Sequence, residues 1–341
     1  LEDDPLRIFR AYRLTATHDF TFEPHARNRI GEIRHGLNKV AVERISDELV
    51  IILSTTNYTP ILRGLYDDNI MKLLLPECEP MTNCSQNDYL HKDVWHHSLA
   101  AMGVLESFLA SPQYLLRRYA DEALPTLAQR IAGERTREIM LKLGVLLHAI
   151  GKPNCRTVDE NGVTHFYGHE VAGARLAGSL CARFCFSNKE IDFVSQLIRH
   201  HMRVVHLFSL QRTSRKALSR LFKLGPELFW PLLFLFGSDY MAAKGPRSRK
   251  AVIGPLCHRI ERWLDFYHKQ LKPKEEEPPL VRGHALMNRF NLSPGPTVGK
   301  LLHTLAELQW EGRISTRQEA LDHAAELLKK WTKRRQKTED R

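Results

Sequence analysis

Apolar residues recur every three or four positions along most of this chain, which is the spacing of amphipathic helices. In the segment 42–53, for example, Ile45, Leu49 and Ile52 fall on one face. The same spacing predicts helices over 6–17, 99–109, 137–150, 169–184 and 189–201. Strong strand patterns are absent, although the segment 158–166, with a Glu-Asn-Gly turn at its centre, is compatible with one small hairpin. The pattern predicts an all-α fold.

Two polar stretches interrupt the helical pattern and indicate segment boundaries. Residues 80–89 are rich in Asn, Ser and Asp, and residues 272–279 (KPKEEEPP) have the charge and proline content of a linker. We therefore expect three segments, at 1–90, 91–271 and 280–341. The longest apolar run is much shorter than the ~20 residues that a membrane span needs, so no membrane partner is expected.

Composition narrows the possible partners. The 341 residues include 50 Lys and Arg against 39 Asp and Glu, a net charge of +11, within an ordinary globular composition that excludes wholesale disorder. The excess charge points to a polyanion such as RNA, although solubility would explain it equally well. Six cysteines without a CxxC pair favour a reduced, cytoplasmic location.

The middle segment contains residues of the types that can bind metals, and each lies on or at the end of a predicted helix. They are His97, His148 in LLHAIGKP, His169 in YGHE, His200 and His201 in IRHHMR, and Asp239 in GSDYM. Imidazoles and carboxylates on facing helices form divalent-metal sites, and a bound metal lowers the pKa of its water. A single histidine is more often structural. Here, however, the apolar neighbours predict that these polar side chains are buried, and a buried polar group needs a partner.

The order of these residues, together with LLH-x-IGKP and GHE, resembles the HD superfamily of metal-dependent phosphohydrolases. The resemblance implies a helical bundle whose ligands point inward to a divalent metal (Ni, Co, Mn, Fe, Mg or Zn). Its ligands would be His97, His148 and Asp239, and Lys152 would lie near the substrate phosphate. The roles left by the resemblance, in a second metal site or in phosphate binding, fall to His169 and His201, with His200 as a competitor.

One position departs from the superfamily pattern, which has Asp directly after the second histidine. This chain has Ala149, whose methyl group cannot bind a metal. Three explanations are open: an engineered inactivating change, a natural loss of catalysis that leaves a binding module, or a weaker metal site held by the remaining ligands. We expect poor phosphoester hydrolysis in each case.

The start of the chain carries a second resemblance. The sequences DDPLRIFRAYR, HDFTFEP and VERISDEL resemble the neck of the class II tRNA nucleotidyltransferase/poly(A) polymerase family. The resemblance implies that Asp4 and Arg7 select an incoming CTP or ATP through Watson–Crick-like hydrogen bonds. Glu43, Arg44 and Glu48 would match the E-R-x-x-x-E motif that supports this pocket.

The C-terminal stretch PGPTVGKLLHTLAELQWEG resembles the same family. Physically, its Pro-Gly-Pro turn leads into an amphipathic helix, near whose start Lys300 could meet an RNA phosphate. The other candidates for binding phosphates are Arg10, Arg13, Arg199, His200 and Arg203. The catalytic head of such an enzyme needs a Gly-Ser turn followed by a D-x-D pair, and this combination does not occur here, so we expect a portion that lacks this head and does not add nucleotides alone.

Three functions follow as hypotheses. The first is an RNA-binding HD phosphohydrolase acting on 2′,3′-cyclic phosphates, 2′-nucleotides or RNA 3′ ends. The second is a non-catalytic RNA-binding body. The third is a part of a CCA- or A-adding enzyme in which the HD segment is auxiliary. All three have RNA as partner, with the tRNA 3′ end and nucleotides as the expected ligands.

Overall fold

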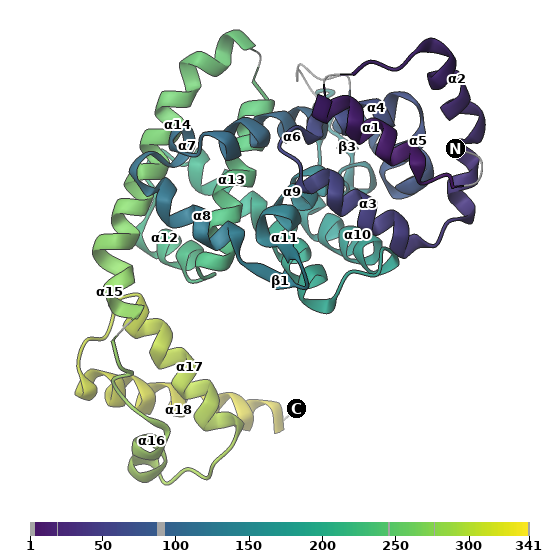
Figure 1. Cartoon of the computed structure of the whole chain (residues 1–341). Coiled ribbons are helices and arrows are strands. Elements are labelled where there is room, and N and C mark those ends of the chain that lie inside the picture. Colours follow the sequence, from purple (N-terminus) through teal and green to yellow (C-terminus); the bar gives the residue numbers. More distant parts are fainter. Residues whose placement is uncertain (1–3, 19, 87–92, 245, 276, 340–341) are drawn as a thin grey trace. The chain divides into compact units, whose positions relative to one another are not determined.

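The structure is a computed structural model that describes residues 4–18, 20–86, 93–244, 246–275 and 277–339 (Figure 1). It comprises two compact units, Leu1–Thr213 with Leu224–Arg262, and Ser214–Lys223 with Trp263–Arg341. Helices dominate both units, which confirms the all-α prediction. None of the helices in the described residues has the length and apolar character required to cross a membrane.

The first unit begins with short helices that correspond to the predicted neck. They are α1 (Arg7–His18), α2 (Pro24–Ile33), α3 (Val42–Ser54), α4 (Tyr58–Asp67) and α5 (Ile70–Leu74), with 3-10 turns at Arg34–Lys39 and Pro76–Met81. Helix α1 packs on α3 and α4 through the fully buried Ile8 and Phe9. The Tyr12 hydroxyl donates a hydrogen bond to Asp68, which joins α1 to the end of α4.

Five helices form a bundle in the middle of the first unit. They are α6 (Val94–Ala110), α9 (Arg137–Leu147), α10 (His169–Arg183), α11 (Asn188–Ser209) and α13 (Pro226–Ala242). Side-chain caps mark the start of three of them: Asp93 caps α6, Thr136 caps α9, and Ser187 with Glu190 forms a capping box on α11. Each cap satisfies backbone N–H groups that the first helical turn leaves without partners.

A buried lysine connects the bundle to the neck. Lys142 on α9 is only 2% exposed, and its Nζ donates hydrogen bonds to the carbonyl oxygens of Leu53 (2.8 Å) and Thr55 (3.4 Å) at the end of α3. It also lies 2.8 Å from a carboxylate oxygen of Glu138. A cation at the carboxyl end of a helix meets carbonyls that lack intrahelical partners, so this contact holds α3 against α9.

Two hairpins and several short helices complete this unit. The predicted hairpin is present, with β3 (Thr157–Val158) antiparallel to β4 (Thr164–His165). A second pair, β1 (Arg130–Ala132) with β2 (Arg135–Thr136), was not predicted because strands of two or three residues show no alternation. The short helices are α7 (Gln113–Leu116), α8 (Ala120–Ala128), and 3-10 turns at Arg117–Tyr119 and Pro153–Cys155.

The structure modifies one predicted boundary. Helix α14 (Pro246–Phe266) continues through a π-helical turn (Tyr267–Leu271) into α15 (Lys272–Glu275). The first half of the predicted linker at 272–279 is therefore helical, because its Lys and Glu residues favour a helix that is already formed. The predicted boundary near residue 90 lies outside the described residues. The three-segment division remains a prediction.

The second unit has its own small core. It contains α12 (Arg215–Phe222), α16 (Gly283–Phe290), α17 (Pro296–Trp310) and α18 (Arg317–Glu339). Leu286, Leu301 and Leu305 are among the buried residues of this core. The Pro-Gly-Pro turn leads directly into α17, as predicted, with Pro296 in its first turn where no N–H partner is needed.

Candidate metal centre and neck motifs

Three helices bring a cluster of potential metal ligands together inside the bundle. His97 lies on α6, His148 directly follows α9, and Asp239 lies on α13. One ligand atom from each lies within 4.8 Å of the other two. The Nε2 atoms of His97 and His148 are 2.8 and 3.6 Å from Asp239 Oδ1. Two imidazoles and one carboxylate form a recurrent ligand set for divalent metals.

Backbone carbonyls fix the rings of three histidines. The Nδ1 atoms of His148, His169 and His201 lie 2.7, 2.8 and 2.6 Å from the carbonyl oxygens of the residues three positions before them. A carbonyl only accepts, so each Nδ1 carries the proton and each Nε2 keeps its lone pair. In metalloproteins, a hydrogen bond of this kind from the other ring nitrogen orients a histidine ligand.

The structure places the two adjacent histidines of IRHHMR differently. His201 is buried, and its Nε2 lies 3.3 Å from Nε2 of His169. Its ring centroid is 5.6 Å from that of His148, so the His169–His201 pair adjoins the cluster of His97, His148 and Asp239. His200 is half-buried and is not brought into this cluster. The helical spacing in the sequence already indicated this difference, because one buried face of α11 carries Val194, Leu197, His201 and Val204.

Burial controls the protonation of the cluster. It lowers the pKa of His97 and His169 to about 4 and that of His201 to about 3. Burial alone would raise the pKa of Asp239, but the neighbouring imidazoles of His148 and His97, the latter hydrogen-bonded to it, hold this pKa well below its usual range. Neutral imidazoles beside an ionised carboxylate are the protonation states that metal ligands need.

Two residues of the LLHAIGKP segment lie next to the cluster. Ala149 is fully buried and offers no ligand atom. The Nζ of Lys152 donates a hydrogen bond to Gln86 Oε1 at 2.6 Å and lies 5.5 Å from the centre of the Phe166 ring. Burial lowers the pKa of Lys152. Its placement near a substrate phosphate remains a prediction.

Gly151 has a structural role that the sequence did not reveal. A Cβ atom at this position would overlap the carbonyl oxygen of His169 and approach the backbone nitrogen of Gly173 to 2.5 Å. The backbone after His148 therefore packs directly on the first turns of α10, which places His148 beside His169. The need for glycine arises from a contact between distant segments, so no local pattern could have indicated it.

The neck motifs meet across α1 and α3. Arg44 Nη2 lies 3.4 Å from both carboxylate oxygens of Asp4. Arg10 and Arg13 lie 3.5 and 3.8 Å from the carboxylate oxygens of Glu48, which is buried. The structure thus pairs Asp4 with Arg44, and both Arg10 and Arg13 with Glu48. Asp3, before the first of them, lies outside the described residues.

The other predicted binding residues lie at several places. Arg7 is exposed on α1, and its backbone N–H donates a hydrogen bond to the carbonyl oxygen of Asp4 at 3.0 Å. Glu43 accepts a hydrogen bond from the Cys185 thiol at 3.5 Å. Arg199 is exposed and Arg203 is half-buried, both on α11 of the first unit. In the second unit, Lys300 Nζ lies 4.7 Å from the centre of the Trp331 ring. Their roles in RNA or nucleotide binding stay predictions.

Comparison with known proteins supports the neck and body resemblance. The family described as "Probable RNA and SrmB- binding site of polymerase A" matches residues 19–82. The A-adding tRNA nucleotidyltransferase of Deinococcus radiodurans is 29% identical over 94% of this chain, and the CC-adding enzyme of Thermus thermophilus is 28% identical over 94%. A solved CCA-adding enzyme shares the fold, with a TM-score of 0.53, 15% identity and 95% of this chain covered.

This chain is therefore tRNA nucleotidyltransferase-like over nearly its whole length, with a helical body. It spans about two thirds of the length of these relatives, namely 67% and 66%, and 59% of the solved structure. The same comparisons do not confirm the HD-superfamily resemblance.

Proposed function

We propose that this chain is the nucleotide-reading and RNA-binding portion of an enzyme that adds CCA or A to the 3′ end of tRNA. The observation that carries this proposal is the similarity to A-adding and CC-adding tRNA nucleotidyltransferases over 94% of the chain. It corresponds to the third of the sequence-based hypotheses, in which the histidine cluster is auxiliary.

The neck geometry supports a role in nucleotide recognition. Asp4 supplies acceptors and Arg7 a planar donor group, which together suit the hydrogen-bonding edge of a base. Arg44 lies within 3.4 Å of Asp4, so it orients the carboxylate that would face the base. The Arg10–Glu48 and Arg13–Glu48 pairs hold α1 against α3 behind these residues.

Binding measurements test this proposal. The chain is expected to bind a tRNA transcript more tightly than a DNA hairpin of equal length, and to bind CTP and ATP. Arg7→Ala should weaken nucleotide binding about tenfold, since a paired base contact contributes about 1–3 kcal/mol. The matched control is Arg29→Ala, on α2, where the arginine pairs with Glu32. Equal affinity for tRNA and DNA, or equal effects of the two variants, would contradict the proposal.

A second function is proposed for the histidine cluster, namely a metal-dependent phosphohydrolase site. The observation that favours it is the approach of His97, His148 and Asp239 within 4.8 Å, with the Nδ1 atom of His148 held by a carbonyl. These residues would hold a divalent metal, which would supply an activated water and polarise a phosphoryl oxygen. The buried histidines His169 and His201 would hold a second metal or a phosphate beside it.

Two histidines, one inside the cluster and one outside it, provide the test. His148→Ala should abolish binding of Mn²⁺ measured by titration calorimetry, whereas His200→Ala should leave it unchanged because His200 is outside the cluster. Hydrolysis of a 2′,3′-cyclic nucleotide should be slow in the natural chain and lost in His148→Ala. Mn²⁺ binding that survives the loss of His148 would refute the site.

A further inference from the structure

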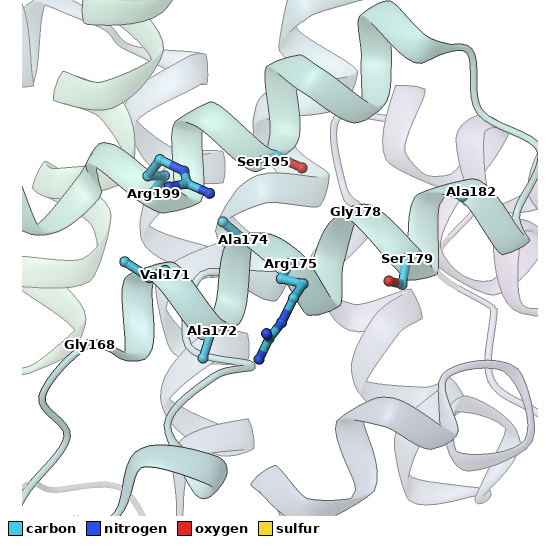
Figure 2. Close-up of a pocket in the computed structure, with 10 residues that line it drawn as sticks. All are labelled: Gly168, Val171, Ala172, Ala174, Arg175, Gly178, Ser179, Ala182, Ser195 and Arg199. Carbon is cyan, nitrogen blue, oxygen red and sulfur yellow. The ribbon is translucent and has the colours of Figure 1, made fainter.

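A groove between α10 and α11 has no place in either proposed function. It has a volume of about 800 Å³ and lies on the first unit, and its lining includes Gly168, directly before His169, and Arg199, two residues before His201. Figure 2 shows its wall and floor, with Val171, Ala172 and Arg175 on α10 and Ser195 and Arg199 on α11. The groove extends along α10 from Gly168 to Ala182, a length of about 21 Å at 1.5 Å per residue.

The floor of the groove is made of small residues. Ala172, Ala174 and Gly178 line it, and a Cβ atom at Gly178 would come within 3.0 Å of Ser195 Oγ. The two helices therefore pack closely at this point. A ligand could approach the backbone of α10 closely along this path.

The polar groups of the groove are donors. Arg175 and Arg199 are exposed on opposite helices, with Ala174 between them in the view of Figure 2. Within the described residues, neither guanidinium has a hydrogen bond or an ion pair, and none of the lining side chains is a carboxylate. Ser179 and Ser195 add two hydroxyl groups. This donor set is complementary to an anion that offers several acceptor oxygens.

We infer that this groove binds the phosphodiester backbone of a single RNA strand, with Arg175 and Arg199 each contacting a phosphate. This inference rests on the proposed RNA-binding function and adds a surface to it. A protein helix could occupy a small-residue groove, but it would have to supply carboxylates to both guanidinium groups. The net charge of +11 and the elongated form of the groove favour a polyanion.

Paired arginine variants test the inference. The probe is a short single-stranded RNA of mixed sequence, followed by fluorescence anisotropy over a series of salt concentrations. Arg175→Gln and Arg199→Gln should each weaken binding several-fold, with no dependence on base sequence. The double variant should lower the slope of log affinity against log salt by about 1.4, at about 0.7 per phosphate contact. The matched control is Arg212→Gln, an exposed arginine outside the groove.

The outcomes separate this inference from the proposed function. If the natural chain does not bind tRNA or RNA, the proposed function and the groove inference fail together. If it binds RNA and the double variant binds with unchanged affinity and slope, only the groove inference is overturned. Cross-linking of 4-thiouridine RNA gives a second readout: cross-links in α10 and α11 support the groove, and cross-links elsewhere alone overturn it. Both arginines are exposed, so unchanged thermal unfolding is expected and verifies the fold.

Discussion

At the scale of single residues, the histidine cluster of the first unit is defined by the orientation of its imidazole rings more than by the types of residue present. Three imidazoles have their Nδ1 atoms held by carbonyls, which leaves Nε2 for a ligand. The order of the motifs was enough to select His97, His148 and Asp239 as a group. The choice of His201 over His200 required the phase of α11, which its apolar residues already contained.

The position after His148 provides the first prediction. Ala149→Asp introduces a carboxylate beside His97, His148 and Asp239, and an added ligand should tighten Mn²⁺ binding at least about tenfold. Hydrolysis of 2′,3′-cyclic nucleotides should rise with it. Metal content of the purified protein and turnover are the measurements, and Ala149→Asn is the control of similar size without charge. Equal metal content and turnover in the natural chain and Ala149→Asp would show that residue 149 does not limit the site.

The buried imidazoles make stability depend on pH. His97, His169 and His201 have folded-state pKa values of about 4, 4 and 3, against 6.5 for an unperturbed histidine. Below about pH 6.5 the unfolded chain binds protons that the folded chain does not, so the free energy of unfolding falls as pH falls. The loss is about 1.4 kcal/mol per pH unit for each histidine. The pKa of Asp239 is low, so this carboxylate stays ionised over the same range.

Urea unfolding at a series of pH values measures this effect. Stability should be flat above about pH 6.5 and should decline steadily towards about pH 4. The variant His201→Gln cannot take up a proton at this position, so its decline should be less steep by one proton. A stability that is constant or rises between pH 6.5 and 4 would be inconsistent with neutral buried imidazoles.

At the scale of elements, the helices that were predicted followed from the sequence because each has an apolar face. The segments 42–53 and 189–201 were predicted, and α3 and α11 occupy them, with α11 extending further to Ser209. The β1–β2 hairpin and the helical start of 272–279 were not predicted, because strands of two or three residues and helix continuation leave no periodic signal. The groove was also missed, since Arg175 and Arg199 lie on different helices and only packing makes them neighbours of one space.

The contact between the IGKP turn and α10 gives a prediction at this scale. In Gly151→Ala the new methyl group would collide with backbone atoms of His169 and Gly173, which cannot rotate away. We expect a loss of about 1–3 kcal/mol in the free energy of unfolding, typical of overpacking, and weaker metal binding because His148 and His169 move apart. Gly254→Ala is the control: a Cβ there meets nothing within 4 Å, and α14 should gain about 0.5–1 kcal/mol. Similar effects of the two substitutions would contradict the proposed packing.

At the scale of the whole molecule, the net charge of +11 has two explanations, RNA binding and solubility, and composition does not separate them. The neck offers one argument for RNA, since residues 19–82 match a family whose description names an RNA-binding site. The groove offers another, because its arginines have no acidic partners among the described residues. Positive charge that serves only solubility does not need to be concentrated on one surface such as this groove.

Salt distinguishes the two explanations. If lysines and arginines neutralise several phosphates, tRNA affinity should fall by roughly a thousandfold between about 50 and 200 mM salt, because each neutralised phosphate releases counterions. Filter binding over a salt series measures the slope, and thermal unfolding in the same buffers verifies that the fold persists. The proposed function of this basic chain of 341 residues requires that tRNA affinity depends steeply on salt concentration. A shallow slope would mean that the excess charge lies away from the RNA, and it would assign the +11 to solubility even if tRNA still binds.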